Sequence, residues 1–196
     1  MTRPLLLASL LLAAGAAQAS GAPHTHDGFY LRLQGGFGGT SASNDDITLK
    51  GGSGGLNVEI GGALTRNFIL YGKLFGTGTP DPDVKIGGIT FETNNDLNGN
   101  FGAVGIGVTY YFMPVNLYIS GAISATSLSL TQNGDKLGDP GNGGGLHLGI
   151  GKEWWVGDQW GLGIGAELAG THVKGDNDTK DWNAGSFLLL FSATFN

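Results

Sequence analysis

The chain contains no cysteine, so disulfide bonds contribute nothing to its stability, and a lipid anchor attached through cysteine is excluded. It also lacks a basic cluster: its ten Lys and Arg are scattered, and the formal net charge is −6. An acidic chain of this kind is not expected to bind nucleic acid. No segment after residue 19 has the 18 or more consecutive apolar residues of a transmembrane helix. If this protein enters a membrane, it must therefore cross it with strands.

The first nineteen residues have the pattern of a secretory signal peptide. Arg3 supplies a positive start, residues 5–14 form a short apolar run, and residues 17–19 are a small-x-small cleavage site. The run is too short to be a membrane anchor, which needs about 20 apolar residues. We therefore predict a signal peptide over 1–19, an unstructured N-terminal segment over 20–27 and one domain over 28–196.

Glycine is abundant, with 38 of 196 residues, whereas about 7% is typical of proteins. The glycines alternate with apolar residues instead of forming polar tracts, which argues against disorder. The clearest example is the segment 145–168, in which one set of alternate residues is apolar. The other set contains glycine, His147, Glu153 and Glu167. A period of two predicts a β-hairpin with one apolar face.

The same period recurs along the chain and predicts eight strands, two of them in the hairpin 145–168. The other six are expected at about 28–38, 55–64, 68–76, 100–112, 116–127 and 185–195. Tight connections near 65–67, 113–115 and 155–159 alternate with long polar ones at 39–54, 77–99, 128–144 and 173–184. Short turns on one side, long loops on the other and an even strand number are typical of outer-membrane barrels.

The distribution of charge supports a membrane barrel over the alternative, a soluble barrel such as a lipocalin. The polar faces of the strands carry only five charged residues, too few for an exterior that meets water. In lipid the apolar set faces outward, and every backbone group is paired around the closed ladder. Aromatic residues also gather at the tight-turn ends, as in the girdles at membrane–water interfaces. The predicted interface aromatics are Phe29, Phe68, Phe112, Trp154, Trp160 and Phe195.

These features resemble the small eight-stranded outer-membrane β-barrel family, the class of the transmembrane domain of outer-membrane protein A. The last strand is similar to the terminal signature of that class, which the barrel assembly machinery reads, although Asn196 follows the final aromatic residue. The matching residues are Phe187, Leu189, Phe191, Ala193 and Phe195. The resemblance implies an all-β fold, an eight-stranded antiparallel up-and-down transmembrane β-barrel, in the outer membrane of a Gram-negative bacterium. It implies outer-membrane lipid, lipopolysaccharide and the assembly machinery as partners, and we expect a monomer.

The inward charges are expected to form a network. An eight-stranded barrel is just wide enough for side chains to fill it, and buried charges need partners. Counting back from a turn at 65–67 puts Glu59 opposite Lys73, and Arg32 on the adjacent strand reaches Glu59 by a diagonal step. We predict an interior ion network of Arg32, Glu59 and Lys73, with Glu153 as a further member. A plug that closes the lumen is the favoured role, and a gate or proton path is the alternative.

The resemblance also raises the question of whether the protein is an enzyme, because small barrels of this kind include lipid A deacylases and palmitoyltransferases. If Trp154 opposes Trp160, His147 faces Glu167 inside the barrel, the only acid–base pair that the sequence suggests. No serine is adjacent to this pair in the sequence, and the His-x-Ser motif of the deacylases is absent. A buried, hydrogen-bonded pair is therefore favoured over a catalytic one.

The expected function is that of a non-enzymatic integral outer-membrane protein that maintains the envelope or presents surface loops. A narrow or gated channel and a lipid A-modifying enzyme are the alternatives. No catalytic residue, cofactor or metal site is predicted, and we interpret the acidic loop residues as solvated turn residues rather than as a calcium or magnesium site.

Overall fold

The computed structural model describes residues 22–92, 97–174 and 180–196, and the side chains of 138–140 are left out. The predicted signal peptide lies outside the described residues. Within them, no helix is long and apolar enough to cross a membrane. The strands are β1 (Phe29–Ser43), β2 (Ile47–Thr65), β3 (Phe68–Pro80), β4 (Asp83–Ile86), β5 (Ile89–Phe91), β6 (Leu97–Phe112), β7 (Leu117–Gln132), β8 (Asp135–Trp155), β9 (Trp160–Val173) and β10 (Trp182–Phe195).

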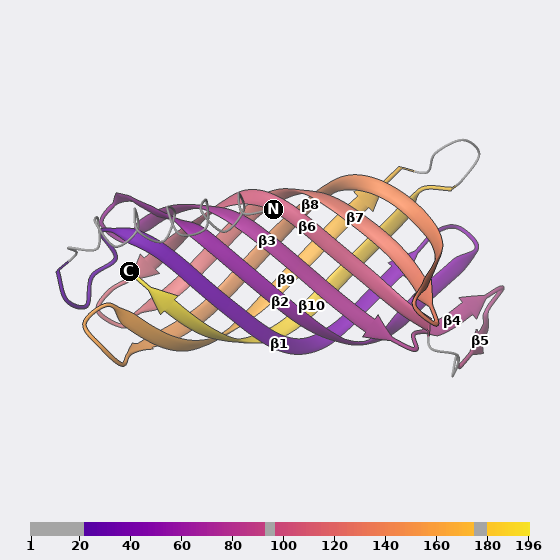
Figure 1. Ribbon diagram of the computed structural model, residues 1–196, viewed down its shortest axis with the longest axis horizontal. Helices are drawn as coiled ribbons and strands as arrows, with labels where there is room; N and C mark the ends of the chain where they lie inside the picture. The colour runs from indigo at the N-terminus through magenta and orange to yellow at the C-terminus, as the bar shows by residue number, and fades with distance from the viewer. Residues whose placement is uncertain (1–21, 93–96, 175–179) are drawn as a thin grey trace, which may run out of the picture.

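Eight of these strands close an antiparallel barrel, which confirms the predicted fold class. Strands β1, β2, β3, β6, β7, β8, β9 and β10 pair in this order, and β1 also pairs with β10 to close the ring (Figure 1). A closed ladder leaves no strand edge within the barrel wall, which is the condition for placing strands in lipid.

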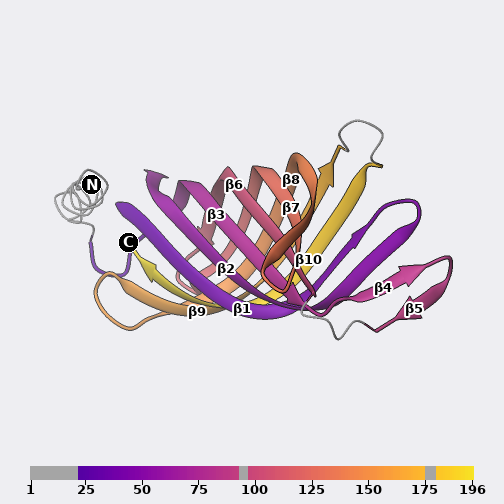
Figure 2. The same cartoon turned by 45° about the vertical axis from the view of Figure 1, so that its right-hand side comes forward.

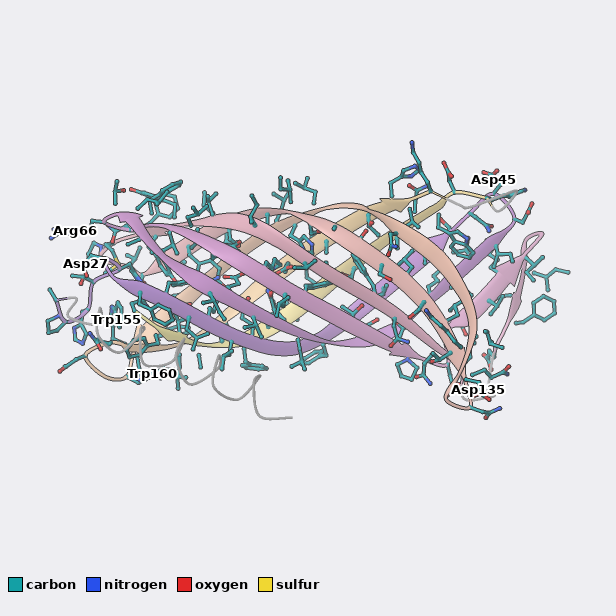
Figure 3. All side chains as sticks on the ribbon, turned by 45° about the horizontal axis from the view of Figure 1, so that its top comes forward. Asp27, Asp45, Arg66, Asp135, Trp155 and Trp160 are labelled. Atoms are coloured by element: carbon teal, nitrogen blue, oxygen red, sulfur yellow. The ribbon has the colours of Figure 1, made fainter. Side chains whose placement is uncertain are left out.

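The barrel has two different ends. The connections 66–67, 113–116 and 156–159 lie at one end together with residues 22–28 and the C-terminus, and we call it the terminal end. The opposite end, called the loop end, carries the connections around Asp45 and Asp135. Figure 3 shows Asp27, Arg66, Trp155 and Trp160 at the terminal end and the two labelled loop residues at the other.

The strands extend farther toward the loop end than predicted. The segments 39–54 and 128–144, predicted to be loops, are mostly strand, with turns at 44–46 and 133–134. Their Gly, Ser and Thr residues give little apolar alternation, yet their backbone groups pair with neighbouring strands, as the pairing of Thr40 with Gly51 shows. The segment 77–99 contains the extra hairpin β4–β5, which pairs with β2 beside the β1–β2 turn (Figure 2).

Apolar side chains cover the outer face of the barrel, and polar and aromatic ones fill the inside. Leu56, Ile106 and Phe191 are 71%, 61% and 63% exposed, whereas Tyr30 and Tyr111 on the inward face are fully buried. This arrangement is the reverse of a soluble protein, and it agrees with the predicted orientation of the two faces.

Candidate functional site

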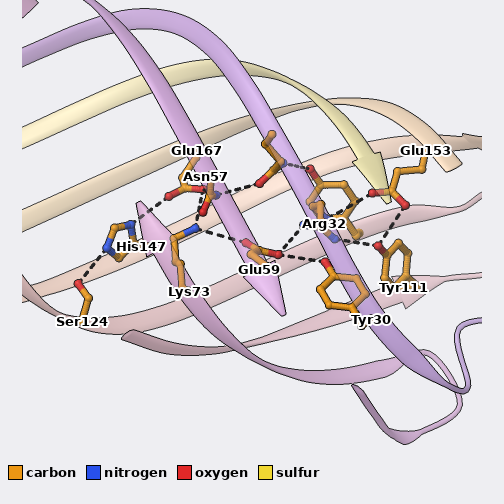
Figure 4. A network of polar contacts seen from close by, with 12 residues as sticks. Tyr30, Arg32, Asn57, Glu59, Lys73, Tyr111, Ser124, His147, Glu153 and Glu167 are labelled. Carbon is orange, nitrogen blue, oxygen red and sulfur yellow. Dashed lines mark hydrogen bonds and ion pairs between the residues drawn. The ribbon is translucent and has the colours of Figure 1, made fainter. Parts of the chain in front are cut away.

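The candidate site is the network of charged side chains inside the barrel (Figure 4). Arg32 on β1 lies at its centre and is fully buried. Its Nη1 is 3.3 Å from Glu59 Oε2, and its Nε is 3.4 Å from Glu153 Oε1. Arg32 Nη2 also donates a hydrogen bond of 2.8 Å to the Tyr111 hydroxyl. The guanidinium carbon is 3.9 Å from the ring centroid of Tyr118, a cation–π contact that adds to the ion pairs.

Lys73 on β3 connects two carboxylates. Its Nζ is 3.3 Å from Glu59 Oε1 and 3.0 Å from Glu167 Oε2. The predicted register is present, because Glu59 is the direct cross-strand partner of Lys73. Arg32 is also directly opposite Glu59, and not one diagonal step away as expected. The expected diagonal step was wrong because a long loop was predicted over 39–54, whereas the strands continue to a turn at 44–46 that sets the β1–β2 register.

Glu153 on β8 belongs to the same network, toward the terminal end. Besides Arg32, its carboxylate accepts hydrogen bonds from the Tyr111 hydroxyl at 3.1 Å and from Thr194 Oγ1 at 2.7 Å. The structure thus brings together all four residues of the predicted ion network. Each carboxylate faces a cation or hydroxyl donors, the condition under which buried charge is tolerated.

His147 on β8 meets Glu167 on β9, but in a different register from the predicted one. Trp154 pairs with Leu162, and the Cα partner of His147 is Ala169, because the turn at 156–159 shifts the register by two residues. The contact is therefore diagonal, with His147 Nδ1 3.0 Å from Glu167 Oε1. Both side chains are buried, at 2% and 5% exposure.

A third residue, Ser124 on β7, completes this group and was missed by the sequence analysis. Its Oγ is 2.9 Å from His147 Nε2. No serine is adjacent to His147 in the sequence, but Ser124 pairs with Gly145, two residues from His147 on the neighbouring strand. Counting the β7–β8 register would have found it, had the length of the connecting loop been known.

The order Ser124–His147–Glu167 is that of a serine–histidine–acid relay. Its surroundings differ from those of a catalytic site, however. The Phe75 ring packs with its centroid 4.9 Å from that of His147. The second carboxylate oxygen of Glu167 accepts hydrogen bonds from Lys73 at 3.0 Å and from Asn57 at 2.9 Å. All three relay residues lie in continuous strand ladders, whose N–H groups are engaged in pairing and not directed at a reacting oxygen.

Apolar and aromatic side chains fill the lumen on both sides of the network. Toward the terminal end a cluster of buried residues includes Tyr30, Tyr71, Tyr111 and Tyr118. Toward the loop end a second cluster contains Phe75, Phe101, Leu128, Val173, Leu188 and Leu190. Beside this second cluster, toward the loop end, lies a small cavity of about 40 Å³. Within the described ranges, no group of three or more His, Cys, Asp or Glu side chains is placed to hold a metal ion.

The six predicted interface aromatics lie near the terminal end of the strands. Phe112, Trp154 and Trp160 are 45%, 49% and 44% exposed. Phe195 is half-buried, and its ring centroid is 5.3 Å from that of Trp160 and 6.3 Å from that of Phe29. Phe68 at the start of β3 is also half-buried. Large rings that face outward at one end of an apolar band form the arrangement of an interface girdle.

Comparison with known proteins agrees with this architecture. The model of the outer membrane protein beta-barrel domain family matches residues 5–195. The crystal structure of Neisserial surface protein A is similar with a TM-score of 0.57 and 16% identity, covering 90% of this chain and 99% of that one. The structure of Ail, the attachment invasion locus protein of Yersinia pestis, in complex with the heparin analogue sucrose octasulfate, has a TM-score of 0.51 and 15% identity, covering 85% of this chain and 99% of that one.

No curated protein sequence matches the chain significantly. The two solved structures therefore show the shared fold, and the family model covers nearly the whole sequence. The closed barrel with an apolar exterior and an aromatic girdle agrees with a barrel domain of the outer membrane. The chain belongs to the outer membrane protein beta-barrel domain family.

Proposed function

We propose that this protein is a monomeric, non-conducting and non-enzymatic outer-membrane barrel, whose role is to hold its loop end at the cell surface. The filled lumen is the observation that carries the proposal. Arg32, Glu59, Lys73, Glu153 and Glu167 form a continuous network of ion pairs, and each is at most 5% exposed. Moving a solute past this network would separate buried ion pairs, at a cost of several kcal/mol for each unpaired charge.

The proposed orientation places the terminal end in the periplasm and the loop end outside. Short turns on the periplasmic side and long extensions on the outside are the rule in such barrels. A signal peptide over 1–19 delivers the chain to the periplasm in this proposal. The barrel then lies in outer-membrane lipid, with the loop-end extensions above the lipopolysaccharide.

The charge of the loop end limits the kind of partner that it can meet. The segments 44–54, 80–99, 131–142 and 174–184 contain eleven acidic residues and five lysines. Lys180 forms an ion pair with one of these acidic residues, since its Nζ is 2.7 Å from Asp46 Oδ2. Ail was crystallised with a polyanion, whereas the acidic surface of this chain favours a neutral or cationic partner.

Conductance in planar lipid bilayers tests the proposal directly. The purified barrel, inserted in its folded form, is expected to produce no discrete conductance steps. Its folded state is checked by the shift in gel mobility on heating. Reproducible steps from the wild-type protein would instead assign a narrow or gated channel, the alternative that the sequence left open.

A further inference from the structure

The segment 22–27, predicted to be unstructured, is bound across the terminal end of the barrel. His26 at its centre is fully buried. Its ring is stacked on Tyr111 with the centroids 3.5 Å apart and the planes within 11°. Its Nδ1 lies 2.8 Å from Asn196 Oδ1, and its Nε2 lies 2.8 Å from Asn116 Oδ1. Both ring nitrogens and one ring face are thus held by residues from distant parts of the chain.

Backbone hydrogen bonds hold the same segment at further points. The His24 N–H donates to the Asp158 carbonyl oxygen, and the Asn67 N–H donates to the His26 carbonyl oxygen, both at 2.9 Å. The His24 ring is stacked on Trp155, with centroids 5.4 Å apart. Figure 3 shows Asp27 and Trp155 at this end of the barrel. The segment therefore bridges the β2–β3 turn and the β8–β9 turn.

Asn196 also contacts the N-terminal segment. Its N–H donates to the Gln159 carbonyl oxygen at 3.0 Å, and its side chain contacts His26. The family resemblance led us to expect an aromatic residue in last position, and Asn196 departed from that pattern. In the structure it joins the N-terminal segment to the C-terminal strand, across the β1–β10 seam that closes the barrel.

The protonation state of His26 decides how well these contacts are satisfied. A neutral imidazole has one N–H and one lone pair, so it needs one amide oxygen and one amide N–H. A half-turn of either asparagine side chain supplies that N–H, because the Nδ2 atoms of Asn116 and Asn196 have no other partner among the described residues. A protonated ring needs both oxygens, leaves both Nδ2 groups unpaired and buries a positive charge.

Burial lowers the pKa of His26 below its ordinary value of 6.5, and this effect outweighs the hydrogen bonds that the ring donates to the Oδ1 atoms of both asparagines, which raise it. The charged groups that face the ring are Arg32 on β1, which lowers the pKa, and Glu153 on β8, which raises it. Tyr111 on β6 covers one ring face, and His24 lies beyond Trp155. The folded state therefore favours the neutral ring. Its contribution to stability is complete above about pH 6.5 and is lost as the pH falls below this value.

We propose that residues 22–27 form an acid-released clasp: neutral His26 fastens the N-terminal segment across the terminal end, and protonation of the ring releases it. The clasp assembles only on a closed barrel, because its partners come from the three turns at the terminal end and from Asn196. It does not depend on whether the lumen conducts, so its test is independent of the conductance experiment.

A fluorophore at the start of the segment reports release. Ala22 is exposed and the chain has no cysteine, so Ala22→Cys provides a single labelling site for a pH-insensitive dye. In lipid vesicles, the anisotropy of the dye is expected to fall reversibly as the pH is lowered from about 7.5 to about 5, the range in which histidine titrates. A constant anisotropy over this range would overturn the proposal, provided that gel mobility shows the barrel to be folded.

Three variants identify the titrating group. His26→Gln, which cannot be protonated in this range, is expected to abolish the pH response, whereas the control His172→Gln, at an exposed position of β9 near the loop end, retains it. Asn196→Asp places a carboxylate beside the ring and stabilises its charged form, so acid should no longer release the segment. A response that persists unchanged in His26→Gln or in Asn196→Asp would refute the role of His26.

Discussion

Glu59 lies directly opposite Lys73 across the β2–β3 pair, and Lys73 Nζ is 3.3 Å from Glu59 Oε1. The other carboxylate oxygen of Glu59 is 3.3 Å from Arg32 Nη1. One carboxylate thus pairs with two buried cations from the strands on either side of β2. Ion pairs of this kind hold three strands in register inside the lumen, where the charged side chains are shielded from bulk water.

Replacing Glu59 with glutamine should therefore destabilise the barrel strongly. The substitution keeps the shape of the side chain but replaces the charged contacts to Arg32 and Lys73 with weaker neutral ones, which should lower the free energy of unfolding by about 1.5–3 kcal/mol. The measurement is the temperature at which the folded gel band converts to the unfolded one. The control is Glu92→Gln, at an exposed loop position, which should migrate as wild type. An unchanged transition in Glu59→Gln would show that the network contributes nothing to stability.

The Ser124–His147–Glu167 relay is expected to be structural. Ser124→Ala removes one partner of His147 and should lower the free energy of unfolding by about 1 kcal/mol. Mass spectrometry of lipid A, from a host that lacks lipid A-modifying enzymes, should give the same spectrum with wild-type protein, with Ser124→Ala and without the protein. A mass change caused by the wild type and abolished in Ser124→Ala or His147→Gln would make the protein an enzyme.

Inward and outward glycines of the same strand should respond differently to alanine. A Cβ atom at Gly107 would lie 2.6 Å from Cζ and the hydroxyl oxygen of Tyr71 and 2.7 Å from Ala122 Cβ, so Gly107→Ala should lower the free energy of unfolding by about 1–3 kcal/mol. A Cβ atom at Gly102, also on β6, would meet nothing within 4 Å. Gly102→Ala should therefore be close to neutral. Urea unfolding in lipid vesicles compares the two, and equal losses would contradict the assignment of the faces.

A charged residue on the apolar outer face should destabilise the barrel only at positions that lie within the lipid. Ile106 is 61% exposed in the middle of the apolar band, and Ile106→Lys is expected to cost about 2–4 kcal/mol near the bilayer midplane. Ser127→Lys, at an exposed position of β7 toward the loop end, is the matched control and should cost less than about 1 kcal/mol. The measurement is again the unfolding free energy in vesicles. Similar costs at both sites would place the membrane elsewhere on the barrel.

Local patterns were sufficient for contacts that depend on one short turn. The pairing of Glu59 with Lys73 was counted from a turn expected at 65–67. In the structure Thr65 pairs with Phe68, and a β-bulge between Ala63 and Thr65 restores the expected register for the rest of the strand. His147 and Glu167 were expected to meet, yet their register was wrong by two residues, because the number of residues in the 156–159 turn cannot be read from alternation. Ser124 was missed because its strand and that of His147 are joined by the long segment 128–144.

The N-terminal segment shows the same limit over longer distances. Nothing around His26 in the sequence indicates burial, because its partners Asn67, Asn116 and Asn196 are distant in the chain. The loop-end extensions were missed for a different reason. Their residues are small and polar, so these paired strands show no alternation of apolar and polar residues in the sequence.

The sequence by itself determined that this protein is a barrel and which face of each strand meets lipid. Side chains alternate along a strand, and a continuous apolar face on eight strands is stable only where it leaves water. The tertiary structure alone decided which polar groups meet inside and how the chain covers its own terminal end. Those contacts join residues from distant strands, and they exist only once each turn has set its register and β1 has paired with β10.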